Sequence, residues 1–231
     1  MITLRKANER GHADYGWLKT FHTFSFSAYF DPKHTKFRSL RVINEDWIAG
    51  GKGFETHPHE NMEIITYLIE GELEHKDSMG NGSVIRRGEL QRMTAGTGVS
   101  HSEINPGSED THLMQIWIVP ERAGLEPGYE QRDFTNVRKP NKLTLLASQV
   151  GNDISLTVHQ DIELYGGFLD TGKQLEYDLS VDRYAWIQLI SGSLIVNGIE
   201  LDQGDGAALE EEKLITIAAS ENSEFLLFDL A

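Results

Sequence analysis

The chain has 231 residues, of which 39% are hydrophobic and 25% charged, as is usual for a globular protein with a sizeable core. It has no cysteine and a formal net charge of −15, which excludes disulfides and thiolate metal sites and argues against binding to a phosphate backbone. Without a basic, apolar leader or a long apolar run, we expect no secretion and no membrane insertion, and a cytoplasmic location.

The first part of the chain is rich in strand-forming residues. In the aromatic segment 20–30, alternation predicts Phe24 and Phe26 on one face, either in the core or against a substrate. Residues 40–48 predict a strand, and the glycine-rich residues 49–53 predict a flexible turn after it.

Further short strands follow, separated by turns. Residues 64–69 and 113–119 are apolar runs of strand length, and residues 77–82 predict a hairpin turn. Gln115 is the only amide in its run, so its side chain either has a buried partner or faces a pocket. Residues 122–141 are predicted to form a loop between domains. Short strands with hardly any helical periodicity predict an all-β fold, an antiparallel barrel or sandwich.

The second half repeats the first in weaker form. Residues 186–194 resemble residues 65–73, with a strand, a glycine and another strand in each. This repeat predicts two barrel domains in tandem, residues 1–135 and residues 136–231.

Two pairs of side chains predict a metal site in the first domain. Alternate residues of a strand point to one face about 6.6 Å apart, so His57 and His59 form one pair, and His101 and Glu103 form the other. Imidazole and carboxylate ligands suit iron, manganese, nickel, cobalt, copper or zinc. A closed site would hold a structural ion, whereas an open site would leave room for a substrate or dioxygen.

The second domain lacks these ligands. His57 precedes Gly71 by 14 residues, and the corresponding position before Gly192 is Asp178, with Ser180 in the place of the second histidine. His159, the only histidine after residue 135, is interpreted as a structural hydrogen-bonding residue. We therefore expect one metal ion per chain, in the first domain.

A second acid, Glu63, competes with Glu103 for the carboxylate position. On a continuous strand Glu63 would lie about 13 Å beyond His59, so it could reach the ion only after a turn at residues 60–61. From spacing alone both acids remain candidates.

The residues around these pairs are similar to cupin motifs. Gly51, His57-Pro58-His59, Glu63 and Gly71 follow the first motif, with Gly71 one place late. Gly88, Gly96, His101 and Asn105 follow the second, although Thr94 replaces a proline and His101 comes two residues late. Together with the segments 93–98 and 22–26, these features resemble the pirin family over the whole chain.

The resemblance implies two cupin-type barrels, a bicupin, in which only the first barrel binds metal. It implies that Glu103 is the carboxylate ligand, which leaves Glu63 as a candidate for a residue that orients a ligand. Gln115, Phe24 and Phe26 remain the candidates for the pocket wall. It also implies a quercetinase, a dioxygenase that opens a flavonol ring with O2 and releases CO, with Fe(II) as the expected ion. In that reaction Glu103 would be the general base.

Other pirins are iron-containing regulators that bind transcription factors or metabolic enzymes. Residues 136–231 have a net charge of −10, from 16 acidic and 6 basic side chains, so this half is the candidate surface for a protein partner. Solubility alone also explains such a charge. The natural substrate, the physiological metal and the oligomeric state do not follow from the sequence.

Overall fold

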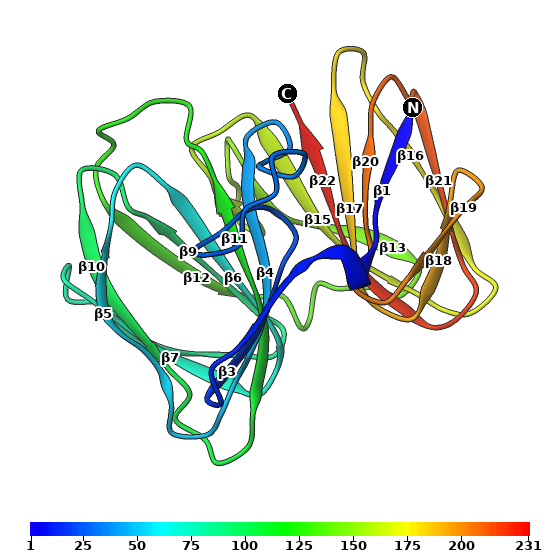
Figure 1. The fold of residues 1–231 in the computed structure, drawn as a ribbon. Coiled ribbons are helices and arrows are strands. Elements are labelled where there is room, and N and C mark those ends of the chain that lie inside the picture. The colour runs from blue at the N-terminus through cyan, green and yellow to red at the C-terminus, as the bar shows by residue number, and fades with distance from the viewer. The chain divides into compact units, whose positions relative to one another are not determined.

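The structure, a computed structural model, describes all residues 1–231 and is built almost wholly from antiparallel strands. Its one helical segment is the 3-10 turn η1 (Ala7–Glu9), so the predicted all-β fold is confirmed. No helical segment has the length and apolar character needed to cross a membrane. The chain divides into two compact units (Figure 1).

The N-terminal unit comprises residues 11–135 and 156–160. A large sheet has the strand order β12-β9-β6-β11-β4-β3-β2, and a smaller sheet has the order β5-β10-β7-β8. The strands of this unit are β2 (Gly11–Asp14), β3 (Leu18–His22), β4 (Leu40–Ile48), β5 (Gly53–His59), β6 (Glu63–Glu70), β7 (Glu72–Asp77), β8 (Gly82–Arg86), β9 (Glu89–Thr94), β10 (Val99–Ile104), β11 (Thr111–Ile118), β12 (Gly128–Asp133) and β14 (Leu156–Thr157).

Apolar side chains from both sheets meet in one core of this unit. Leu18, Ile48, Leu68 and Leu113 come from the large sheet, and β7 and β8 of the small sheet supply others. Figure 1 shows β5 and β10 side by side along one wall of the unit, as their hydrogen-bonded register requires. The metal-ligand candidates lie on this wall.

The C-terminal unit comprises residues 1–10, 136–155 and 161–231. One sheet contains the consecutive strands β1-β20-β17-β22-β15-β13, and the other has the order β16-β21-β18-β19. The strands are β1 (Ile2–Arg5), β13 (Lys142–Ser148), β15 (Ile162–Leu169), β16 (Gln174–Asp178), β17 (Tyr184–Ser191), β18 (Ser193–Val196), β19 (Ile199–Asp202), β20 (Gly206–Leu209), β21 (Leu214–Ala219) and β22 (Ser223–Leu230).

The repeat seen in the sequence is present in the backbone. Gly71 joins β6 to β7 with a φ of 83°, and Gly192 joins β17 to β18 with a φ of 84°. A Cβ at Gly192 would lie 2.3 Å from the carbonyl oxygen of Asn222, so a side chain there would meet backbone in a left-handed conformation. Both positions therefore require glycine for the same reason.

Two sequence predictions were wrong. The alternating strand expected through Phe24 and Phe26 ends at His22, because the Ser25 hydroxyl bonds to the backbone of Asp31 and His34 and so favours a turn. The loop expected over residues 122–141 contains the strand β12, which pairs with β9. As a largely polar edge strand, β12 has no apolar run that would have indicated it.

The division of the chain at residue 135 stays a prediction, and two segments lie across it. Strand β1 pairs with β20 and belongs to the C-terminal unit. There Lys6 Nζ lies 2.7 Å from Asp205 Oδ2, and the Ala7 N–H donates to Asp205 Oδ1 at 2.7 Å. Residues 156–160 belong instead to the N-terminal unit.

Candidate metal centre

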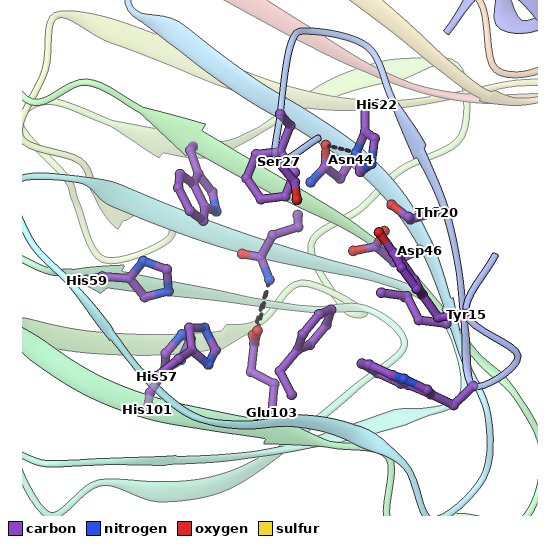
Figure 2. Close-up of a pocket in the computed structure, with 16 residues that line it drawn as sticks. Tyr15, Thr20, His22, Ser27, Asn44, Asp46, His57, His59, His101 and Glu103 are labelled. Carbon is purple, nitrogen blue, oxygen red and sulfur yellow. Dashed lines mark hydrogen bonds between the residues drawn. The ribbon is translucent and has the colours of Figure 1, made fainter. Parts of the chain in front are cut away.

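A cavity of about 400 Å³ opens inside the N-terminal unit (Figure 2). Its aromatic lining comes from Tyr15, Trp17, Phe26, Phe54 and Trp117. Its polar lining includes His57, His59, His101, Glu103 and Gln115, together with Thr20, His22, Asn44 and Asp46. A cavity of this size, with apolar walls and a few convergent polar groups, is suited to a small organic molecule.

Three histidines converge at one end of this cavity. Strands β5 and β10 pair so that His57 lies opposite His101, and Pro58 between the two β5 histidines is exposed, as period-2 alternation requires. The register with β5 shifts after His101, where Glu103 pairs with Phe54, so the extra residue of the bulge lies in β5 and Glu103 stays on the same face of β10 as His101. The nitrogen atoms of His57, His59 and His101 that could bind a metal lie within 4.8 Å of one another.

Hydrogen bonds fix which ring nitrogen faces the cavity. His57 Nδ1 donates to the carbonyl oxygen of Glu55 at 2.7 Å, which leaves its Nε2 as a lone-pair donor. His101 Nδ1 lies 3.4 Å from His75 Nδ1, and its buried Nε2 has no hydrogen-bond partner. A buried nitrogen without a partner is costly, so His101 fits a site completed by a metal ion.

The surroundings keep two of these rings neutral. Burial, followed by the proximity of His101 and His57, lowers the pKa of His59 to about 4. Burial, followed by the proximity of His57 and His75, lowers the pKa of His101 to about 3. Because only neutral imidazole can bind a metal, both residues are in the form that binding requires at neutral pH.

A buried polar network lies behind His101, and the sequence analysis missed it. His75 Nε2 bonds to Asp77 Oδ2 at 3.2 Å, and Gln91 Nε2 donates to His75 Nδ1 at 3.1 Å. The carboxylate fixes the proton of His75 on Nε2, so the single acceptor lone pair on Nδ1 is shared between Gln91 Nε2 and His101 Nδ1. The alternation of His75 and Asp77 in one strand was the available signal, but only the pairing of β7 with β10 gives it meaning.

Glu103 is buried at the floor of the cavity and belongs to a second, overlapping group with His75 and His101. Gln115 Nε2 donates to its two oxygens at 3.2 and 3.1 Å, and the Thr66 hydroxyl donates to Oε1 at 3.3 Å. Figure 2 draws a hydrogen bond to the Glu103 carboxylate as a dashed line and places Glu103 beside His57 and His101. Gln115, for which the sequence left two environments open, has both a buried partner and a place in the cavity wall.

The other candidates are separated by the fold. Phe26 lines the cavity, whereas Phe24 is buried and absent from its lining. Glu63 does not line the cavity either, and its Oε2 accepts from the backbone N–H of His159 at 3.3 Å and contacts the ring Nδ1 at 3.4 Å. His159 thus has a structural partner and joins no ligand group.

The corresponding interior of the C-terminal unit is filled by side chains. Asp178 and Ser180 are exposed, while Leu175 and Tyr177 of the same segment pack against the core. Tyr177 donates to Asp229 Oδ2 at 2.6 Å, and the Arg183 side chain contacts the same carboxylate. No cluster of metal-binding side chains occurs in this unit.

Comparison with known proteins assigns the family. The model of the family described as Pirin matches residues 3–118, and that of the quercetinase C-terminal cupin domain matches residues 145–230. The chain belongs to the pirin family. It is 51% identical over 231 residues to quercetin 2,3-dioxygenase of Escherichia coli K12. The alignment covers 100% of this chain and 99% of that protein.

Other pirins agree over the full length. A pirin-like protein of Caulobacter vibrioides is 39% identical over 232 residues, with complete coverage of both chains. The crystal structure of the bacterial pirin YhhW from Escherichia coli in complex with nickel(II) has a TM-score of 0.95 and 50% identity, covering 100% of this chain and 99% of that one. The expected pirin resemblance and the bicupin fold are therefore confirmed.

Proposed function

We propose that this pirin is a metal-dependent dioxygenase of the quercetin 2,3-dioxygenase type, which opens a flavonol ring with O2 and releases CO. The observation that carries the proposal is the unpartnered Nε2 of His101 beside two further histidines in an aromatic cavity. The 51% identical relative from Escherichia coli, named for this activity, supports it.

His57, His59, His101 and Glu103 are the residues that would hold the ion, and Fe(II) is the ion we propose. Nitrogen and carboxylate ligands also accept manganese, nickel, cobalt, copper or zinc, and the nickel complex of YhhW supports a site for a divalent transition metal. When bound, such an ion acts as a Lewis acid that lowers the pKa of a hydroxyl beside it.

The side chains around the site would position the substrate and move its proton. Trp117 and Phe26 meet edge to face, with ring centroids 5.3 Å apart, and present apolar surface on which a flat flavonol can pack. Glu103 would accept the proton of the flavonol 3-hydroxyl. Gln115 and Thr66 would hold the Glu103 carboxylate in place and prevent it from turning away.

The test is turnover of quercetin in air by protein stripped of metal and then loaded with each candidate ion. We expect no activity without metal, and CO release with at least one ion. Lack of CO with every ion, in protein shown to be loaded, would reject the dioxygenase proposal.

A further inference from the structure

A polar strip lies across the cavity from the three histidines. It is formed where β3 and β4 pair, with Thr20 opposite Asp46 and His22 opposite Asn44. Figure 2 draws Thr20 and Asp46 on one side of the cavity and His57, His59 and His101 on the other. The aromatic walls lie between these two polar ends.

One member of the strip has an unused hydrogen-bonding group. His22 Nδ1 and Asn44 Oδ1 bond to each other at 2.9 Å. Asp46 is only 3% exposed, and although Thr20 bonds to its carboxyl group, its buried Oδ1 has no hydrogen-bond partner. Buried polar atoms in native proteins nearly always have a partner, so an unpaired carboxyl oxygen on a residue that lines a cavity can be satisfied by a ligand hydroxyl when the carboxyl group turns toward the cavity.

We propose that Asp46 is a specificity residue, which accepts a hydrogen bond through Oδ1 from a substrate hydroxyl remote from the metal. The pocket would then select aromatic molecules that carry hydroxyl groups at both ends, over those that carry one only at the metal end. This inference rests on the proposed function and names the substrate class for that site.

The environment of Asp46 supports this role. Burial is the main cause that raises the pKa of Asp46 to about 7, and the charges of Glu103 and Glu45 also raise it. The hydrogen bond from Thr20 lowers this pKa, but by less than burial raises it. A carboxyl group in this range is present in both protonation states near neutral pH. Either state leaves an oxygen that can accept from a phenolic hydroxyl.

The test measures binding and turnover of two flavonols by metal-loaded protein. Quercetin carries hydroxyls on both ring systems, whereas 3-hydroxyflavone carries only the hydroxyl expected at the metal. Affinity is measured with O2 excluded, from flavonol fluorescence, and turnover is then measured in air.

Asp46→Leu removes the acceptor and Asp46→Asn keeps one. Glu45→Gln is the matched control, since Glu45 is the neighbouring acid, bonds to His112 at 3.0 Å and does not line the cavity.

We expect Asp46→Leu to weaken quercetin binding about 10-fold, the loss for one hydrogen bond, and to change 3-hydroxyflavone binding less than about 2-fold. Asp46→Asn should restore most of the quercetin affinity, and Glu45→Gln should match the wild type for both flavonols. Melting temperatures of all variants show whether each is folded. If Asp46→Leu does not fold, Asp46→Ala removes the acceptor instead: a selective loss of quercetin affinity supports the inference, and equal losses or no loss overturn it.

The results separate this inference from the proposed function. Equal losses for both flavonols in Asp46→Leu, or no loss for either, would overturn the role of Asp46 while CO release by the wild type upheld the dioxygenase. Selective loss of quercetin binding without any CO release would uphold Asp46 and reject the dioxygenase. Failure of the wild type to bind either flavonol would reject both.

Discussion

Replacing Asp46 by asparagine should change how the stability of the protein depends on pH. The ordinary pKa of the carboxyl group is 3.8, and burial raises it to about 7 in the folded state. In the unfolded chain the group ionises as the pH rises through 3.8, whereas in the folded chain it stays protonated until about pH 7. The folded state therefore loses stability as the pH rises across this window. Asparagine cannot ionise, so the variant does not have this loss.

The magnitude follows from the pKa difference. One pKa unit corresponds to about 1.4 kcal/mol, so the two units between pH 5 and pH 7 give about 3 kcal/mol. The gain from Asp46→Asn should be larger at pH 8 than at pH 5 by this amount. Since about 1 kcal/mol moves the melting temperature of a domain of this size by roughly 2–4 °C, the difference should be roughly 6–12 °C.

Thermal unfolding of metal-free wild type and variant at the two pH values measures this difference. Thr20→Val offers a second check, because the Thr20 hydrogen bond lowers the pKa of Asp46 and its removal should raise that pKa further. A difference between wild type and Asp46→Asn that is the same at pH 5 and pH 8 would refute the burial argument.

Three further predictions concern the metal site. Replacing His57 and His59 together by alanine should abolish metal binding, measured by elemental analysis. The circular dichroism spectrum should remain that of the folded protein, because neither side chain belongs to a core cluster. Retained metal would contradict the ligand assignment. Glu103→Gln should keep most of the metal and lose roughly 10²- to 10⁴-fold in quercetin turnover, the range for a positioned base, so a loaded and fully active variant would argue against that role. His75→Phe should weaken metal affinity roughly 10- to 100-fold, because His101 loses the acceptor that orients its ring. Competition with a chelator measures this affinity, and an unchanged value would show that His75 does not position His101.

The common face of each ligand pair was predictable because it depends on strand periodicity alone. His57 and His59 alternate with an exposed proline, and His101 and Glu103 alternate in the same way, so each pair faces one side. That both pairs face one cavity depends on the pairing of β5 with β10, which spacing only suggested.

The groups around the ligands depend on strand pairing and could not be read from spacing. His75 is significant because β7 lies beside β10, and Gln91 joins it from the other sheet. Asn44 and Asp46 alternate within a strand whose bounds were predicted correctly, so their common face was visible in the sequence. The unpaired oxygen of Asp46 could not be predicted from the sequence, because it depends on which side chains of other strands lie close to it.

Metal content and CO release measured on one sample of untagged protein test the metal-dependent dioxygenase proposal. We expect one divalent ion per chain. We also expect CO release from quercetin in air that disappears when the ion is removed and returns when it is restored. Two ions per chain, or quercetin turnover that is unchanged after the metal is removed, would contradict the proposal.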